Sequence, residues 1–571
     1  MPHDLVIRGG HVADGLGADP IEADVAVDRG TIVGVGAVPE RGREEVDAAG
    51  LLVTPGFVDI HTHYDGQATW DARLAPSSWH GVTTVVMGNC GVGFAPVRPD
   101  AHDRLISLME GVEDIPGSVL HEGIDWTWES FAGYLDALET KPHDIDFCAQ
   151  LPHGALRLYV MGERAARLEE ATEEDALVMR SLATEALRAG AIGFTTSRSP
   201  SHETPDRRPV ASRVAPWDEV RRLVGVMGEM NTGIFEIAGE GVDRDPGNPG
   251  LKDYHRRLRE LAVETGRPIT FGVFSRKDAP DIWRNYLTLL EETAAAGGRM
   301  FGQVHSRWLS AILSFKTQLP FDRLPVWKDL RALPLAEQKQ RLRDPELRRR
   351  LVEAARERDT RKALGTEARP PVYDWLFVMD TVEGPHQTVA EVAKMRGVDP
   401  VEAMIDLALE KDFELFFLQP IANENQDHAL ELIKHPHTVV TFSDSGAHVS
   451  QLMDASLQTH LLSHWVRTKQ AFTLEQAVRM ISFDTATRWG FADRGLVREG
   501  FAADLVVFDP DTIGPEMPEV VSDLPAGAKR LTQRCRGVAA TVVNGEVLLR
   551  DGKHTGALPG RLLRGPLAKS A

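Results

Sequence analysis

The chain has 571 residues, a formal net charge of −20 and three cysteines, with hydrophobic and charged fractions of 42% and 26%. This length exceeds one core of ordinary size, so we expect one large domain and a smaller satellite. The acidic balance argues against nucleic acid as a partner, because no basic excess is available to neutralise phosphates. The few cysteines argue against a disulfide framework, and neither a signal peptide nor a bilayer-spanning apolar run is visible. We therefore expect a cytoplasmic protein that does not bind membranes.

The two ends of the chain are rich in predicted strands. Short apolar runs alternate with Gly-containing turns over residues 4–53, and the same texture returns over residues 503–510 and 540–552. Because both ends have this texture and the middle does not, we predict that residues 1–55 and 490–571 fold together as one small β-sandwich domain.

The middle of the chain, residues 56–489, has a different pattern. Apolar strand-like runs alternate there with helical stretches, which is typical of βαβ units. Eight such runs are present, the number that a closed parallel barrel needs. The predicted fold class is therefore α/β, with a (β/α)8 TIM barrel as the large domain. The eight predicted strands are residues 56–63, 83–90, 145–152, 191–197, 232–238, 268–274, 300–306 and 438–444.

A long excursion, about residues 307–437, separates the last two predicted strands. Its segment 328–362 is dense in Arg, Glu and Leu at helical spacing, which predicts an exposed helical insertion. A lid over the barrel mouth is the alternative for the same segment.

The first predicted barrel strand ends in two histidines, His61 and His63. Catalytic side chains of such barrels lie at the carboxyl ends of strands, and residues i and i+2 of a strand point to the same face. Both imidazoles can therefore reach one cation at the barrel mouth. Neutral imidazole binds Zn, Fe, Ni or Cu, and Zn²⁺ is the most common of these in hydrolases.

The last predicted strand ends in Ser443 and Asp444. A carboxylate at this position can bind a cation and accept a proton from water. An aspartate that caps a helix or a turn looks the same in the sequence. The two histidines seven strands earlier favour the metal-binding interpretation.

Three motifs carry a family resemblance. The run PGFVDIHTHYDGQ, the NCG at Asn89–Gly91 and the SDSGAH at residues 443–448 resemble the amidohydrolase superfamily, and more narrowly its D-aminoacylase (N-acyl-D-amino-acid deacylase) branch. The resemblance spans nearly the whole chain and is least clear after His305. It implies a barrel, a β-sandwich made from both termini, and a metal-activated water with an aspartate of the last strand as general base. On this chain those roles fall on His61, His63 and Asp444.

The resemblance also implies a role for Cys90, because relatives use the cysteine of the NCG motif as a metal ligand. Relatives carry further histidines after the fifth and sixth strands, where this chain has Glu236 and Val273. Valine cannot bind a metal, so we predict one divalent cation, most readily Zn²⁺, rather than two. The predicted donors are His61, His63 and Asp444, with Cys90 or Glu236 completing the set.

Three candidates for substrate binding follow the third and seventh strands. His305 and Arg307 would bind a substrate carboxylate, because a guanidinium pairs with a carboxylate in bidentate fashion; a surface ion pair of Arg307 is the alternative. His153 opens an HGxLR stretch similar to that of the family, and would either line the site or cap a helix.

Three more candidates surround the same mouth. Arg198 follows the fourth strand beside Ser197, where relatives bind substrate. Tyr64 would either stabilise a developing oxyanion or line the mouth as an ordinary aromatic side chain. His448 lies four residues after Asp444 and would support that carboxylate.

Together these features predict a metal-dependent hydrolase that cleaves an amide bond of a small-molecule substrate, with Asp444 as general base. The leading substrate is an N-acyl amino acid, and its D configuration is implied by the resemblance alone. Cyclic amides, carbamates and small esters are the alternatives within this chemistry. A non-catalytic relative that works in binding or assembly is the alternative outside it. An iron redox enzyme is disfavoured, because no flavin or nicotinamide fingerprint is present. The resemblance also implies a homo-oligomer.

Overall fold

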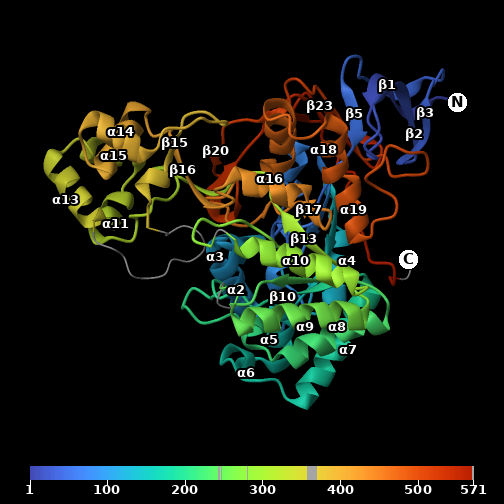
Figure 1. Ribbon diagram of the computed structural model, residues 1–571, viewed down its shortest axis with the longest axis horizontal. Helices are drawn as coiled ribbons and strands as arrows, with labels where there is room; N and C mark the ends of the chain where they lie inside the picture. Colours follow the sequence, from blue (N-terminus) through green and yellow to red (C-terminus); the bar gives the residue numbers. More distant parts are fainter. Residues whose placement is uncertain (242–244, 246, 280, 357–369, 569–571) are drawn as a thin grey trace.

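The computed structural model describes residues 1–241, 245, 247–279, 281–356 and 370–568. Figure 1 shows three parts: a central barrel, a β-sheet near the amino terminus, and an insertion that projects on the opposite side. Within the described ranges, every helix is too short or too polar to cross a membrane.

The barrel contains the eight strands that the sequence predicts. They are β6 (Phe57–Asp59), β7 (Val82–Met87), β8 (Asp146–Ala149) with its continuation β9 (Leu151–Pro152), β10 (Gly193–Ser197), β11 (Ile234–Ala238), β12 (Ile269–Gly272), β13 (Met300–Val304) and β17 (Thr438–Val440). Neighbours pair in parallel, as β6–β7–β8 and as β9–β10–β11–β12–β13–β17. Thr62 pairs in parallel with Ser445 beyond β6 and β17, which closes the ring. The predicted α/β barrel fold is confirmed.

Helices cover the outside of the barrel, so β7 and β10 are buried along their whole length. α7 begins with a capping box of Thr172 and Asp175 and ends at Gly190 in the left-handed conformation. The outer helices are α5 (His153–Met161), α7 (Glu173–Ala189), α8 (Trp217–Glu229), α9 (Pro249–Thr265), α10 (Ile282–Ala295), α16 (Gln426–Lys434), α18 (Leu474–Ile481) and α19 (Phe483–Trp489). The connections also contain α1 (Gln67–Trp70), α2 (His102–Glu113), α3 (Gly117–Gly123), α4 (Phe131–Glu139), α6 (Glu163–Ala166) and α17 (Leu457–His460).

Strands from both chain ends form one nine-stranded sheet. They are β1 (His3–Val12), β2 (Ile21–Asp28), β3 (Thr31–Gly36), β4 (Gly42–Asp47), β5 (Leu52–Pro55), β18 (Leu505–Phe508), β23 (Val538–Val543), β24 (Glu546–Arg550) and β25 (Lys553–His554). The two ends join where β18 pairs antiparallel with β5. Val25, Val507 and Val542 are fully buried in the core beneath this sheet. Four short strands, β19 (Gly514–Pro515), β20 (Glu519–Val521), β21 (Arg530–Thr532) and β22 (Cys535–Arg536), lie between β18 and β23.

The insertion differs from the helical expectation, because it also contains a three-stranded antiparallel sheet. The sheet is formed by β14 (Leu309–Leu313), β15 (Phe377–Met379) and β16 (Phe416–Ala422). The helices are α11 (Pro325–Arg331), α12 (Leu335–Arg341), α13 (Pro345–Ala355), α14 (Val389–Arg396) and α15 (Pro400–Glu410). Trp327, Leu351 and Phe417 share a core in which helices cover the sheet. Residues 357–362 of the predicted helical segment lie outside the described residues.

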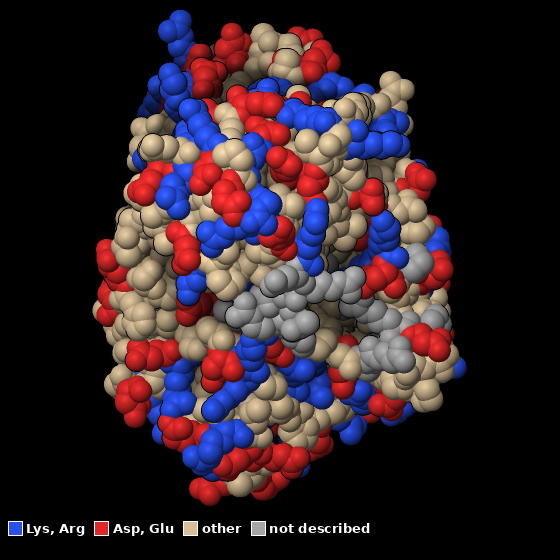
Figure 2. All heavy atoms as spheres, turned by 90° about the vertical axis from the view of Figure 1, so that its left-hand side faces the viewer, with Lys and Arg blue, Asp and Glu red and all other residues tan. Residues whose placement is uncertain are grey.

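Charges on the insertion are of both signs. Figure 2 looks from the insertion side and shows basic and acidic side chains interspersed over that face. Arg349 pairs with Glu346 and Glu353 along α13, and Arg396 of α14 pairs with Glu410 of α15. Such pairing is typical of solvated helices and differs from the basic stripe of a nucleic-acid-binding surface.

Candidate metal centre

Buried side chains from four segments meet at the carboxyl end of the barrel. His61 and His63 follow β6, Cys90 lies in the turn after β7, and Asp444 follows β17. The fourth segment is helix α2, which lies in the long connection after β7 and ends at Glu113. All five side chains are buried.

The donor atoms of three of these side chains are spaced as metal ligands are, and Oδ1 of Asp444 lies close to both histidines. His61, His63 and Cys90 offer one atom each within 4.8 Å of one another. Nε2 of His61 lies 3.6 Å from Sγ of Cys90 and 3.4 Å from Oδ1 of Asp444, and Nε2 of His63 lies 3.6 Å from the same oxygen. With zinc bonds of about 2.0–2.3 Å, neighbouring corners of a tetrahedron lie about 3.3–3.7 Å apart. The residues therefore fit a divalent cation.

Unsatisfied polar atoms point to the same conclusion. Both ring nitrogens of His63 and Oδ1 of Asp444 are buried without a hydrogen-bond partner among the described residues. An orphaned buried polar group costs about 1–3 kcal/mol, and more when it is charged. A cation bound between these atoms would remove that cost.

His61 is oriented from behind by Gln303 of β13. Nδ1 of His61 lies 2.7 Å from Oε1 of Gln303, whose Nε2 donates to the Thr270 hydroxyl at 3.2 Å. Since the amide oxygen only accepts, Nδ1 of His61 carries the proton and Nε2 presents its lone pair to the cluster. The His61 ring also stacks on Phe442, with centroids 3.8 Å apart.

The turns that carry Cys90 and Asp444 have strained backbones. Their φ angles are +57° and +51°, in a region that costs a non-glycine residue on the order of 1–3 kcal/mol. Gly446 allows the second turn to pack closely, because a Cβ there would lie 2.6 Å from the carbonyl carbon of His63. The SDSGAH motif is therefore fixed directly against the strand end that carries the histidines.

Glu113 is the member of the cluster that sequence reasoning missed. Its Oε2 lies 3.4 Å from Nε2 of His63. Burial lowers the pKa of His63, but the Glu113 and Asp444 carboxylates outweigh burial and raise that pKa to about 9. Burial raises the pKa of Glu113 itself. No motif marks Glu113, because it ends a helix in a connection rather than following a strand.

Glu236 lies behind Cys90, where its Oε2 accepts the Cys90 backbone N–H at 3.0 Å. Burial raises the pKa of Glu236 to about 8. Val273, at the other position where relatives carry a histidine, is buried in the apolar core. Asp65, a further buried carboxylate that the sequence did not single out, has its pKa raised by burial to about 6.

Comparison with known proteins shows the family to which the chain belongs. Residues 44–549 match the model of the amidohydrolase family. The chain belongs to that family. It is 28% identical to D-aminoacylase of Alcaligenes xylosoxydans xylosoxydans, covering 99% of this chain and 98% of that protein. It is 27% identical to N-acyl-D-aspartate deacylase of the same organism, covering 98% and 95%. The predicted D-aminoacylase branch and enzyme class, a hydrolase of C–N bonds other than peptide bonds, are confirmed at the level of the family.

Solved structures show the same fold. A D-aminoacylase described as having a binuclear metal centre, with one-metal activation and second-metal attenuation, gives a TM-score of 0.66 at 23% identity, covering 99% of this chain and 100% of the other. N-acyl-D-glutamate deacylase of Bordetella bronchiseptica, complexed with zinc and a phosphonate inhibitor, gives a TM-score of 0.65 at 23% identity, with the same coverage of both chains.

Tyr64 and His448 lie beside the cluster of this amidohydrolase. The Tyr64 hydroxyl is 2.8 Å from the Ser77 hydroxyl, so part of its hydrogen-bonding capacity is already used. Nε2 of His448 lies 3.7 Å from Oε2 of Glu113. His448 therefore contacts the carboxylate that the sequence did not predict.

His305 and Arg307 form a second buried group with Asp454. Nε of Arg307 lies 3.6 Å from Oδ1 of Asp454, and its Nη1 donates to the Met453 carbonyl at 3.1 Å and to the Ser456 hydroxyl at 2.6 Å. Nδ1 of His305 accepts the Arg307 backbone N–H at 3.1 Å. The Arg307 guanidinium is thus buried and held by other protein groups, so the surface ion pair that was the alternative is not formed. Nε2 of His305 and Oδ2 of Asp454 have no hydrogen-bond partner among the described residues, and carboxylate binding by His305 and Arg307 stays a prediction.

His153 and Arg198 are also held by internal contacts. The two ring nitrogens of His153 lie 2.8 Å from the Thr196 hydroxyl and 2.8 Å from Glu219. Arg198 donates to the Ala215 carbonyl at 2.5 Å and lies 3.4 Å from Glu240. The structure therefore does not bring either predicted residue to the cluster as a free group.

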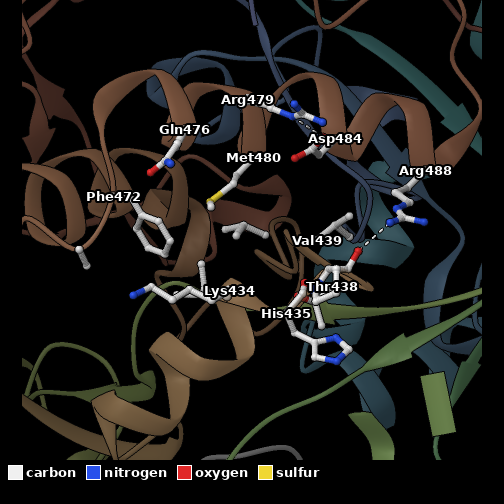
Figure 3. Close-up of a pocket in the computed structure, with 14 residues that line it drawn as sticks. Lys434, His435, Thr438, Val439, Phe472, Gln476, Arg479, Met480, Asp484 and Arg488 are labelled. Atoms are coloured by element: carbon white, nitrogen blue, oxygen red, sulfur yellow. Dashed lines mark hydrogen bonds and ion pairs between the residues drawn. The ribbon is translucent and has the colours of Figure 1, made fainter. Parts of the chain in front are cut away.

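Two cavities lie near β17. The one beside Asp444 has a volume of about 20 Å³, enough for about one water molecule, and is lined by residues 443–447, Asp454 and Arg530. A larger cavity of about 630 Å³ lies between α16, α18 and α19 at the amino end of β17 (Figure 3). Its Arg479 is paired with Asp484. Barrel enzymes work at the other end of the strands, so we place the site at the first cavity.

Proposed function

We propose that this amidohydrolase hydrolyses the amide bond of an N-acyl amino acid, with D-configured substrates as the first candidates. The observation that carries the proposal is the set of buried donor atoms of His61, His63 and Cys90, which are spaced for one cation. Both nitrogens of His63 and Oδ1 of Asp444 lack protein partners among the described residues. The D-aminoacylase and deacylase relatives support the substrate class.

We assign the cation site to His61, His63, Cys90 and Asp444, and propose Zn²⁺ as its occupant because imidazole, thiolate and carboxylate all suit zinc. One ion is proposed, since Glu236 accepts a backbone N–H and the other position is a valine. A bound divalent cation supplies a Lewis acid that lowers the pKa of bound water and polarises a carbonyl.

Asp444 is the proposed general base. Burial raises the pKa of Asp444, but His63 and His61 outweigh burial and lower it below the ordinary value. The carboxylate is therefore ionised at neutral pH and can take the proton of the attacking water. The Asp444 carboxyl group can later pass that proton to the leaving nitrogen, which makes the amine a better leaving group.

A cyclic amide or a small ester is the second candidate substrate. The observation that favours it is that Arg307 and Arg198 are both engaged by the protein. Arg530, which lines the small cavity beside Asp444, is paired with Asp523 through two contacts of 2.8 Å. A substrate without a free carboxylate would leave these pairs intact.

A panel of N-acetyl-D- and N-acetyl-L-amino acids, a hydantoin and an aryl acetate tests both candidates, each assayed with zinc-loaded protein and after chelation. We expect metal-dependent release of amine from the N-acyl amino acids. Faster turnover of the hydantoin or the ester would favour the second candidate. Failure of the zinc-loaded protein on every compound would refute the proposed function.

A further inference from the structure

We propose that Glu113 is itself a metal ligand, adding a second carboxylate to the donors His61, His63, Cys90 and Asp444. The inference rests on the proposed function, because it concerns the cation of the same site. Neither the sequence motifs nor the family resemblance gives this residue a role.

The carboxylate of Glu113 is buried and faces the cluster. Its Oε2 lies 3.4 Å from Nε2 of His63, which equals the distance between Nε2 of His61 and Oδ1 of Asp444. Glu113 thus approaches one histidine of the cluster as closely as Asp444 approaches the other.

Backbone contacts hold Glu113 in this position. The carbonyl oxygen of Glu113 accepts the N–H of His448 at 2.6 Å, and the carboxylate of the next residue, Asp114, accepts the Ser450 hydroxyl at 3.1 Å. Both partners lie in the loop that follows Asp444. The end of α2 is therefore tied to the turn that carries the proposed base, so the two carboxylates are fixed relative to each other.

A simple ion pair between Glu113 and His63 is the alternative explanation. Within the described part of the chain, however, Nε2 of His63 and Oε1 of Glu113 have no hydrogen-bond partner, whereas a buried ion pair is stable only with well-formed hydrogen bonds. Together with Asp444 and a Cys90 thiolate, Glu113 brings up to three negative charges to two imidazoles. A divalent cation balances most of that charge.

The test compares wild-type protein, Glu113→Gln and Asp103→Asn. The second variant makes the same carboxylate-to-amide change on the same helix, at a side chain that is 88% exposed. Zinc affinity is measured by competition with a chromophoric chelator, and Co²⁺-loaded proteins are compared by their visible absorption.

We expect Glu113→Gln to bind zinc about 100-fold or more weakly, since partners outside the ligand set already change affinity about 10–100-fold. The Co²⁺ spectrum should change in Glu113→Gln and remain wild-type in Asp103→Asn. An unchanged spectrum would overturn the inference, because Glu113 would then act from outside the ligand set. Wild-type affinity in Glu113→Gln would overturn it as well.

Two further measurements separate this inference from folding and from the proposed function. X-ray absorption of the zinc-loaded wild type needs no variant. It should give one sulfur and five nitrogen or oxygen donors, four of them from the protein and one from bound water. One sulfur with four or fewer nitrogen or oxygen donors would contradict the inference. If wild-type protein binds neither Zn²⁺ nor Co²⁺, the proposed function fails together with the inference. If it binds zinc and hydrolyses amides while Glu113→Gln behaves as wild type, only the inference fails.

Discussion

Two buried clusters of histidine and carboxylate lie in the same barrel and differ in one respect. Around His153, both ring nitrogens are bonded, and Glu219 also holds the Arg157 guanidinium. Around His63, both ring nitrogens lack a partner among the described residues, although Asp444 lies only 3.6 Å away. In the first cluster both nitrogens of the histidine and both oxygens of the carboxylate have protein partners. In the second cluster the His63 nitrogens and Oδ1 of Asp444 have none among the described residues.

The difference shows that burial and charge alone do not mark a functional site. Both clusters combine histidine with carboxylate, and both lie near strand ends. What separates them is whether the histidine nitrogens and the carboxylate oxygens already have protein partners. We therefore propose that the His153 cluster stabilises the fold and that the His63 cluster binds the metal and takes part in catalysis. Variants in the two clusters test this difference.

The largest effect is expected from Asp444→Asn. It should lower kcat about 10²–10⁴-fold, because that is the usual contribution of a positioned proton-transfer group. The matched control is Glu219→Gln, the same kind of change in the other cluster, which should leave kcat close to that of the wild type. Steady-state kinetics of folded, zinc-loaded proteins measures both. Near-complete activity in Asp444→Asn would remove Asp444 from its role.

Glu219→Gln should instead lower the free energy of unfolding by about 3–5 kcal/mol, because it leaves the buried Arg157 guanidinium without its carboxylate. Urea denaturation at pH 7 measures this loss, and zinc affinity should be unchanged. A loss of stability comparable to that of a surface substitution would show that the His153 cluster is not structural.

The stability of the protein in acid also tests whether Glu219 is paired in the His153 cluster. Burial raises the pKa of Glu219, but His153 and Arg157 outweigh it and lower the pKa to about 2, from an ordinary value of 4.5. A carboxylate whose pKa is lower in the folded than in the unfolded state stabilises the folded protein at pH values above its unfolded pKa. For Glu219 this contribution, roughly 3 kcal/mol, is complete above about pH 5 and is lost as the pH falls toward 2. Wild type should therefore lose more stability than Glu219→Gln between pH 5 and pH 3. Parallel profiles would contradict the pairing.

The smallest effect is expected from Tyr64→Phe. Its hydroxyl contacts Ser77, so the variant should lose about 1 kcal/mol of stability and little activity. Thermal denaturation and kcat on the same preparation decide the matter. A large fall in kcat with normal stability would instead support the predicted oxyanion role of Tyr64.

The sequence identified the cluster residues that stand at strand ends within recognisable motifs. It did not identify Glu113, and position at a strand end alone did not bring Arg198 or Arg307 into the cluster. His61, His63, Cys90 and Asp444 stand at strand ends in recognisable motifs, so their convergence is a consequence of the closed barrel. Glu113 reaches the same place from a helix end, where no spacing or motif marks it. Strands β14, β15 and β16 were missed because they flank the Arg- and Glu-rich segment 328–362, whose helical pattern dominates the insertion, and because the resemblance is least clear there.

Elemental analysis of purified wild-type protein and of His61→Ala, after incubation with zinc and removal of the excess, decides whether the cation site exists. We expect about one equivalent per chain in the wild type and the loss of that equivalent in His61→Ala, with the variant still folded. No metal in the wild type, or the same content in both proteins, would contradict the claim that the unpartnered donors around His61 and His63 form a cation site.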